Sequence, residues 1–593
     1  MKMRNRNMIC SGLMGLMLMS ASCTKQLDQR AVSTATKDAV FSSEDGLKLY
    51  TLSFYNMLPS ISDIYKTDAS LSDFGATSSV PDYIREGAYS ARQGSGWSWG
   101  DLRNVNYFLQ NCNNPAVPED IRNNYIGVAK FFRAYFYFDK LVRFGDVPWY
   151  NKPLDVADTA LLYKGRDSRT VIMDSIVADL DFAANHIIDI SDATRSQITK
   201  TVVWGFKSRV CLFAGTFRKY QTAYKLGSTA DNYLKMAADA ADSVIKSGVY
   251  SLNTVGDQPY RSLFISESPV ASEIMLADIS SVSLAKYNDA NWYFTSATYG
   301  SRFSFTRTFI NTYLMRDGKP FTDLPGHDTM VFASEVKNRD LRLQQTIRMG
   351  NYQRISGGNK VAAPPAFSYT YTGYMPIKWT LDDMYYDGGS LNTNSISLMR
   401  YAEILLNYAE AKAELGTLTD QDWQLSVGAL RSRAGISSGT DGKPTRIDPY
   451  MQKTYFTDIT DPSIMEIRRE RGIELCLEGF RMDDLIRWKH AELLELPWNG
   501  FYVPALNKPL DLNGDGILDV AFYTTAPSSK ISGVTYIDVS KQPQTLSEGT
   551  KGELHWLDNV PRVWHDYQYL YPIPYADLQV NPALKQNPGW EEK

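Results

Sequence analysis

Apolar residues recur every three or four positions through much of the chain, which is the spacing of one helix face. In 168–188, for example, the stripe runs through Val171, Ile176 and Leu180. Ser42 or Ser43 is placed to cap the first such stretch. The pattern predicts helices over 43–58, 101–112, 120–144, 168–188, 198–217, 233–247, 397–415 and 423–434.

Taken in order, these eight helices form four pairs, each helix with the next. Small residues such as Ala237, Ala241, Ala402 and Ala409 permit the close helix contacts of tetratricopeptide repeats. A lone pair cannot bury its apolar faces, whereas four stacked pairs build a continuous core. We therefore predict a mostly α fold, a tetratricopeptide-like superhelix of helical pairs with large irregular or short-strand insertions.

The stretch from Ser463 to Trp488 combines a helical apolar stripe with many charges. It is predicted to be one helix, opened by a capping box of Ser463 and Glu466. Gly472 and Gly479 would lie on one face, where another backbone could approach. The predicted charge pairs, each about one turn apart, are Arg471 with Glu474, Glu478 with Arg481, and Asp483 with Arg487.

Two long regions, 59–100 and 249–396, lack helical periodicity. The C-terminal part, 463–593, contains a third irregular region, which follows the stretch from Ser463 to Trp488. Loops of this length inside a compact domain are usually functional or disordered. Their richness in Tyr, Phe and Trp argues against disorder. We therefore expect the function to lie on these excursions from the helical frame.

The N-terminus has the organisation of an export signal. Lys2, Arg4 and Arg6 precede a short apolar run, and small residues then lead to Cys23. We predict a lipoprotein signal peptide over 1–22, an acylated Cys23, a polar tether over 23–41 and one domain over 42–593. Several acyl chains on one Cys would anchor the protein to a membrane. The alternative is an ordinary secretory signal peptide followed by an incidental Cys.

Composition limits the remaining functional classes. The 593 residues carry a formal net charge of -4, and no aromatic-plus-basic stretch outweighs this, so nucleic acid is not expected as a partner. The mature chain retains Cys112, Cys211 and Cys476 in apolar helical contexts, where they are expected to be small buried side chains. No Cys and His spacing suggests zinc.

The order of residues in several segments resembles one known family. The segment RRERGIEL..EGFR..DLIRW (468–488) resembles the C-terminal signature of the SusD/RagB family of outer-membrane nutrient-binding lipoproteins. Further segments resemble its other motifs in the same order: the opening helix, AKFFRAYFYFDKLVRFGDVPWY (129–150), NRDLRLQQTI (338–347), LMRYAEILLNYAEAKAELG (398–416) with ALRSRAGI (429–436), and YLYPIP with NPALKQNPGW (569–590).

The resemblance implies a tetratricopeptide-like superhelix that carries an irregular ligand-binding region. It also implies an outer-membrane location facing the cell exterior, and a SusC-like TonB-dependent transporter as partner. The acidic cluster that often follows the acylated Cys in exported relatives is reduced here to Asp28. Membrane anchoring is therefore better supported than surface exposure.

A bound oligosaccharide would need aromatic faces for its rings and polar side chains for its hydroxyl rims. Family members bind glycan with aromatics from the first loop and the large insertion, so the resemblance identifies regions rather than single residues. Trp99 is expected to be core, because it leads directly into a helix. The candidate ligand-binding residues are Asp73, Tyr83, Arg85, Trp97, Tyr287, Asn291, Trp292, Tyr293 and Tyr299.

Catalytic readings are weaker. GWSWG (96–100) matches the G-x-S-x-G nucleophile elbow, but that elbow needs a buried strand before its serine, and 90–95 has the pattern of a polar loop. Glycoside hydrolysis would need two carboxylates about 5 to 9.5 Å apart, which sequence cannot show. We therefore predict a binding protein with no catalytic residues and no catalytic cofactor.

The segment DLNGDGILD (511–519) matches the first nine positions of an EF-hand-like calcium loop. Phe522 stands where the loop would place its bidentate Glu. The alternative is an Asx-rich turn without metal. The candidate ligands of a structural calcium ion are Asp511, Asn513, Asp515, the Ile517 carbonyl and Asp519.

Two function classes remain. The favoured one is a non-enzymatic protein that captures glycan and passes it to the transporter. The other is a repeat scaffold that binds peptides or other outer-membrane components. Exposed aromatics along one groove would favour the first, and a smooth apolar groove would favour the second.

Overall fold

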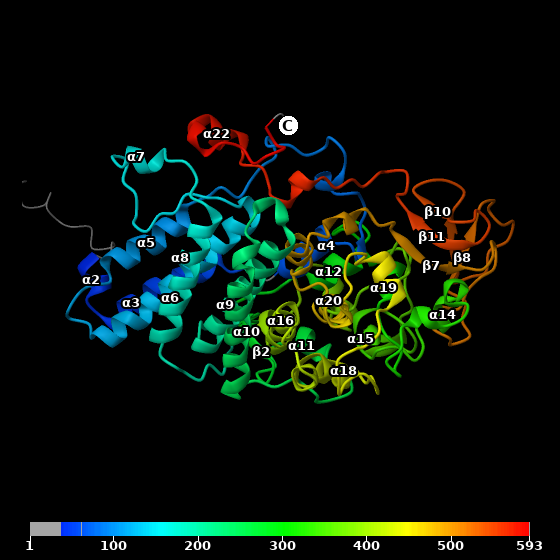
Figure 1. Cartoon of the computed structure of the whole chain (residues 1–593). Coiled ribbons are helices and arrows are strands. Elements are labelled where there is room, and N and C mark those ends of the chain that lie inside the picture. Colours follow the sequence, from blue (N-terminus) through cyan, green and yellow to red (C-terminus); the bar gives the residue numbers. More distant parts are fainter. Residues whose placement is uncertain (1–36, 61, 592–593) are drawn as a thin grey trace, which may run out of the picture.

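Long helices make up most of the N-terminal part of the chain in the computed structural model, which describes residues 37–60 and 62–591 (Figure 1). The predicted signal peptide and Cys23 lie outside these residues. No helix within the described ranges is long and apolar enough to cross a membrane. The helices of this part are α2 Lys37–Phe41, α3 Glu44–Leu52, α4 Asp63–Ser70, α5 Gly100–Asn111, α6 Glu119–Phe144, α7 Thr159–Leu162, α8 Arg169–His186, α9 Lys200–Tyr220 and α10 Ala230–Ser247.

These helices pack against one another in pairs. α6 packs against α8 and α9 against α10, and α10 also contacts α16 (Tyr401–Glu414). α3 meets α5 through the rings of Tyr50 and Tyr107, and the Tyr50 hydroxyl donates to Asn104 at 2.7 Å. Ala237 and Ala402 are fully buried, as the close contacts require. The predicted mostly α, tetratricopeptide-like fold is confirmed.

The irregular regions contain short strands and single helical turns. β1 pairs antiparallel with β3, which holds the first loop against the large insertion. Further antiparallel pairs are β2–β6, β4–β5 and the sheet β10–β11–β7, whereas β8 and β9 are parallel. The strands are β1 Gly75–Ala76, β2 Ile274–Asp278, β3 Ser304–Phe305, β4 Gln353–Ser356, β5 Asn359–Ala362, β6 Ile396–Arg400, β7 Asn499–Val503, β8 Val520–Tyr523, β9 Thr535–Asp538, β10 Gln544–Leu546 and β11 Gly552–Trp556.

Short helices fill the rest of these regions. They are α11 Ser262–Ile265, α12 Ala290–Thr295, α13 Arg307–Ile310, α14 Phe332–Glu335, α15 Leu343–Thr346, α19 Pro449–Thr454 and α22 Tyr575–Val580. A second core of buried rings, including Phe74, Phe305 and Trp379, lies beneath them. Cys112, Cys211 and Cys476 are buried free thiols, as predicted.

Two predicted helices begin differently in the structure. Residues 396–400 form β6, which pairs with β2, so the predicted helix 397–415 begins only at Tyr401. The predicted helix 423–434 is α17 (Asp420–Trp423), a π-helical turn over 424–428, and α18 (Ala429–Arg433). α17 starts early because Thr419 and Asp422 form a capping box.

The single helix predicted over 463–488 is wrong. The structure has two helices there, α20 (Pro462–Glu474) and α21 (Arg481–Trp488), and Asp461 rather than Ser463 caps the first. The chain turns between them with positive φ at Leu477 (59°) and Gly479 (83°). Gly479 therefore supplies a left-handed turn, a conformation that glycine adopts without strain.

The charge pairs predicted along that helix are also wrong. None of the three predicted pairs forms: Asp483 is half-buried and has no ion-pair partner among the described residues, and the other five side chains are buried and pair with other groups. The observed pairs are Arg471 with Asp484, Glu478 with Lys378 and Arg400, Arg481 with Asp73, and Arg487 with Glu410 and Asp484.

Glu474, the last residue of α20, is the centre of this buried network. Its carboxylate accepts from Arg342 at 2.8 Å, from Arg400 at 2.6 Å, and from Arg433. Burial alone would raise the pKa of Glu474, but the guanidinium groups of Arg433, Arg400 and Arg342 hold it well below the ordinary value. One carboxylate thus joins α20 to α18, to β6 and to the segment before α15.

Replacing Glu474 with Gln should destabilise the protein strongly, because three buried guanidinium groups would lose a common counter-charge. We expect the free energy of unfolding to fall by about 3–5 kcal/mol, measured by urea denaturation. The matched control, Glu548→Gln, removes an exposed carboxylate that pairs only with Lys551 and should change stability by less than about 0.5 kcal/mol. Equal effects of the two substitutions would contradict the central role of Glu474.

Candidate functional site

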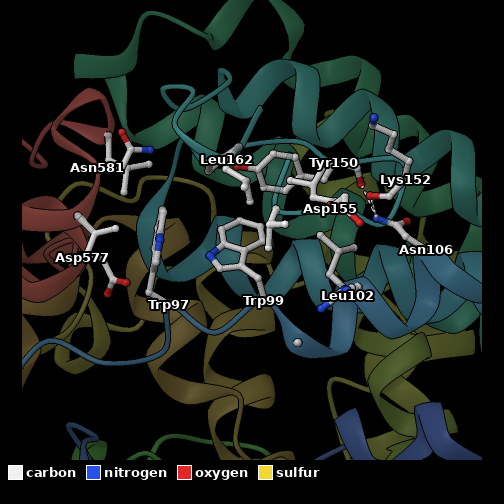
Figure 2. Close-up of a pocket in the computed structure, with 17 residues that line it drawn as sticks. Trp97, Trp99, Leu102, Asn106, Tyr150, Lys152, Asp155, Leu162, Asp577 and Asn581 are labelled. Carbon is white, nitrogen blue, oxygen red and sulfur yellow. Dashed lines mark hydrogen bonds between the residues drawn. The ribbon is translucent and has the colours of Figure 1, made fainter. Parts of the chain in front are cut away.

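A cavity of about 480 Å³ lies between α5, the loop that follows α6, and the C-terminal segment around α22 (Figure 2). Its volume is in the range of small-molecule sites. Its walls come from three segments that are far apart in the sequence. The lining residues are Trp97, Trp99, Gly100, Leu102, Arg103, Asn106, Pro148, Tyr150, Lys152, Leu154, Asp155, Val156, Leu162, Asp577, Val580, Asn581 and Leu584.

Three partly buried aromatic rings form the centre of this cavity. The rings of Trp97 and Trp99 are 5.3 Å apart and nearly perpendicular, at 78°. Trp99 meets Tyr150 in the same way, at 5.6 Å and 79°, and Trp97 packs on Phe144 behind it. Figure 2 shows both indoles side by side, with Tyr150 beyond Trp99. All three rings are partly exposed where they line the cavity, so each presents some ring surface to a ligand.

Several polar side chains of the cavity are occupied in holding its walls. The Asn106 amide donates to the carbonyl oxygens of Tyr150 at 2.9 Å and Lys152 at 3.3 Å. This fixes the loop after α6 against α5. Lys152 itself pairs with Asp158 at 2.9 Å. Asn581 donates to the Lys164 carbonyl at 3.0 Å, which fixes the C-terminal wall.

Two charged side chains of the lining are free to meet a ligand. Within the described residues, the side chains of Arg103 and Asp577 make no hydrogen bond or ion pair, and burial raises the pKa of the Asp577 carboxyl. A cavity with aromatic walls and few free polar groups is suited to binding a ring-shaped ligand with hydroxyl groups.

The predicted residues of the first loop lie in different surroundings. Trp97 lines the cavity. Tyr83 is buried, stacks on Tyr571 at 4.4 Å and donates to the Gln568 carbonyl at 2.7 Å. Arg85 is exposed and pairs with Asp82; together with Tyr83 it lines a separate, smaller cavity of about 320 Å³.

Asp73 differs from the sequence-based expectation of a residue on a loop surface. It is buried and binds Arg481 through two contacts of 2.7 Å. The physical reason is the signature stretch, whose Arg481 needs a buried counter-charge. Asp73 therefore supports the fold and does not face a ligand.

In the large insertion, Trp292 and Tyr299 form one stacked, partly exposed pair, with ring centres 3.7 Å apart. The Tyr299 hydroxyl donates to Asp289 at 2.5 Å, and Lys66 of α4 binds the same carboxylate at 2.6 Å. Neither ring lines the cavity of Trp97. The structure therefore separates the predicted aromatics into two places.

The other predicted insertion residues are less available. Asn291 is fully buried and bonds to Asn392, Asp387 and the backbone at 381. Tyr293 is buried, with its hydroxyl against Ser301 at 3.0 Å. Tyr287 is half-buried, and its hydroxyl reaches the Val282 carbonyl at 3.4 Å. Asn291 and Tyr293 are therefore part of the interior of the insertion, contrary to the expectation of exposed loop residues.

Comparison with known proteins identifies the family. The model of the SusD family matches residues 276–590, which is more than half of the chain. The chain belongs to the SusD family. The SusD-like protein P38 of Formosa agariphila is 25% identical over 423 residues, 67% of this chain and 72% of that protein.

Solved structures agree with this SusD fold. A SusD-like protein of Bacteroides fragilis has a TM-score of 0.67 at 21% identity, covering 93% of this chain and 98% of its own. A second B. fragilis protein, described as SusD-like and carbohydrate-binding, has the same TM-score at 20% identity, covering 92% and 100%.

Sequence reasoning missed several residues of the main cavity in this SusD family member. Trp99 was expected to be core, but it is partly exposed and lines the cavity. It precedes the first residue of α5, so its ring extends past the end of the apolar face that Leu102 and Val105 bury. Tyr150 and Asp577 were not singled out; their signals were the GDVPWY turn after α6 and the YADLQVNP segment.

Ser98 of the GWSWG segment lies in an irregular loop. Residues 94–99 form neither helix nor strand, and Ser98 is exposed. The strand that a nucleophile elbow requires is thus missing from this described segment.

The predicted calcium loop forms an Asx-rich turn. Asp511 accepts from the backbone N–H groups of Gly514 and Gly516 at 2.6 and 2.8 Å, and Asp519 accepts from that of Leu512 at 2.7 Å. Within the described ranges, no group of three or more His, Cys, Asp or Glu side chains is arranged to hold a metal ion. Burial raises the pKa of Asp519, and Asp511 and Asp515 raise it further. This concentration of negative charge is compatible with a divalent cation.

Calcium remains a prediction for this loop. We expect titration of the intact protein with calcium to release binding heat, with a dissociation constant of about 10⁻⁴–10⁻³ M because the bidentate ligand is missing. The double substitution Asp511→Asn and Asp515→Asn should abolish the heat. Asp538→Asn, an exposed change outside the loop, is the control. If the wild-type titration released no heat, the loop would be an Asx-rich turn that binds no calcium.

Proposed function

We propose that this SusD family member is a non-catalytic glycan-binding protein of the outer membrane, anchored by lipid at Cys23. In this proposal it captures an oligosaccharide and passes it to a SusC-like TonB-dependent transporter. The observation that carries the binding function is the cavity of Trp97 and Trp99, with Tyr150 beside them and Arg103 and Asp577 unpaired.

Sugar chemistry fits this cavity. The C–H face of a pyranose packs on an indole, while its hydroxyl groups need donors and acceptors at the rim. The partly exposed Trp97 and Trp99 supply the faces, and Arg103 and Asp577 supply one donor and one acceptor. The B. fragilis relative described as carbohydrate-binding supports the same ligand class.

The proposal includes no catalytic step. Ser98 lies outside the strand context that its motif requires. Asn106 and Asn581 donate their side-chain amides to backbone carbonyls and so hold the walls of the cavity in place. Incubation with candidate polysaccharides should therefore produce no new reducing ends, and their appearance would show an enzyme.

The proposal also includes a lipid anchor at Cys23 and a SusC-like transporter as partner. The export-signal pattern before Cys23 supports the anchor, and family membership supports the transporter. Cys23→Ala should move the protein from the membrane fraction to the soluble fraction. Retention of the variant in the membrane would refute lipid anchoring.

One observation favours the alternative of an interaction scaffold. Val156 and Val580 at the rim of the cavity are 88% and 67% exposed, and Leu162 beside them is also exposed. An apolar rim of this kind is common at protein interfaces. Val156→Asp with Val580→Asp would then abolish capture of an outer-membrane partner, as measured by co-purification of that partner with the full chain.

Glycan binding is tested by removing the two indoles. Trp97→Ala and Trp99→Ala should each weaken binding of the cognate oligosaccharide about 5- to 30-fold in calorimetry, since a ring contact contributes about 1–2 kcal/mol. Circular dichroism would confirm that the variants fold. Tyr385→Ala, which removes a ring that is 68% exposed elsewhere, is the control.

The variant Trp292→Ala separates the two aromatic places. Loss of affinity in Trp292→Ala alone would move the glycan to the stacked pair of the insertion. Unchanged affinity in all three Trp variants would refute ring stacking as the basis of recognition.

A further inference from the structure

A second cavity, of about 440 Å³, lies inside the helical frame between α4, α6, α9 and the turn that joins α20 to α21. It shares no lining residue with the cavity of Trp97 and Trp99. Aromatic side chains supply much of its wall: Phe131, Tyr135, Phe138, Phe206, Phe480 and Tyr571.

Two polar groups of this wall have no partner in the described part of the chain. The carboxyl group of Asp483, at the start of α21, makes no hydrogen bond or ion pair, and neither does the Tyr135 hydroxyl. The next residue, Asp484, is by contrast bound to both Arg471 and Arg487. Both side chains are half-buried, so these polar groups are open to a ligand that enters the cavity.

A further carboxylate, that of Asp139, lies on the same wall as Asp483. Asp139 of α6 lines the same wall and is exposed, so it lies toward solvent, where it contacts Lys140 at 3.2 Å. Asp139 and Tyr135 are four residues apart on α6, and therefore on one face of that helix.

The other charged groups near Asp483 are already occupied. Arg209 binds Glu403, Glu478 binds Arg400 and Lys378, Arg143 donates to Ser95, and Asp68 accepts from the N–H groups of Gly479 and Arg481. The guanidinium of Arg143 lies over the Tyr571 ring at 4.1 Å. Within the described residues, no lysine or arginine side chain forms an ion pair with Asp483, although the charge of Arg209 opposes the rise of its pKa.

The environment of Asp483 disfavours its charge. The pKa of this carboxyl is raised to about 7, first by burial and then by the negative charges of Asp484, Asp139 and Asp68. The positive charge of Arg209 acts in the opposite direction and lowers the pKa. A positive charge placed in the cavity would reverse this effect. The aromatic rings around the same space attract cations through their faces.

We propose that this cavity binds a protonated amine carried on a compact ring, with amino sugars as the ligand class. The ammonium group would lie between Asp483 and Asp139, within reach of the Tyr135 hydroxyl, and the ring would pack among Phe206, Phe480 and their neighbours. The volume fits one or two sugar rings. Only the choice of sugar as the ring depends on the proposed function.

The test compares a glucosamine disaccharide with its N-acetylated counterpart at pH 6, by calorimetry on the full chain. The two ligands have the same rings but differ in charge, so the amine should bind at least tenfold more tightly. Asp483 is mostly protonated at this pH, because its pKa is about 7. Binding should therefore release close to one proton per ligand, measured in two buffers of different ionisation enthalpy.

Asp483→Asn should weaken amine binding at least tenfold and abolish the proton release. Asp139→Asn changes the exposed carboxylate of the same cavity and should weaken amine binding severalfold. It replaces Asp483→Asn as the test variant if Asp483→Asn does not fold. The matched control is Asp538→Asn, which removes an exposed carboxylate that lines neither cavity and should leave amine binding and proton release unchanged.

Equal affinity for the two disaccharides, or unchanged proton release in Asp483→Asn, would overturn the inference. Its failure is distinguishable from failure of the proposed function. If neutral glycan binding is lost in Trp97→Ala while no ligand responds to Asp483→Asn, the proposed function holds and the amine site does not.

A measurement without ligand gives a further check. Since the folded-state pKa of Asp483 is raised above its unfolded value, its contribution to stability is fully present below about pH 4 and is lost as the pH rises through about 7. Asp483→Asn lacks this titration. The Tm of the variant relative to wild type should therefore be higher at pH 8 than at pH 4, and a constant difference would contradict the raised pKa.

Discussion

Three buried guanidinium groups around the Glu474 carboxylate fix the relation between the helical frame and the insertion. Arg400 comes from β6, Arg433 from α18, and Arg342 from the segment before α15. Charges taken out of water are stable only when each has a partner in good geometry. The network therefore permits one arrangement of these segments, whereas apolar contacts alone tolerate several.

The same constraint extends to the loop that leads to the tryptophans of the main cavity. Arg481 binds Asp73, and the backbone N–H groups of Gly479 and Arg481 bind Asp68 at the end of α4. The pairing of β1 with β3 then holds this loop against the insertion. The segment that carries Trp97 is thus attached at its beginning, through Asp68 and Asp73, to the turn between α20 and α21.

Local patterns predicted the frame well, since α6 spans Glu119–Phe144 where apolar spacing predicted 120–144. They failed for 463–488, because periodicity does not register a left-handed turn at Gly479, and because charges one turn apart look paired. In the site, Trp97 was identified by residue type and loop context. Trp99 and Asp577 were not, because three distant segments form that cavity and no local spacing records their meeting.

Adjacent aspartates at the start of α21 show how such a site can be recognised. Asp484 lies toward the interior and is held by Arg471 and Arg487, whereas Asp483, one helix position earlier, lies toward the cavity and is unpaired. Successive residues of a helix point about 100° apart, so identical side chains reach different surroundings. Asp484 is paired, so the half-buried and unpaired carboxyl group of Asp483 beside aromatic rings is a feature that the fold alone does not require. Its demand for a positive partner is met when a ligand supplies one.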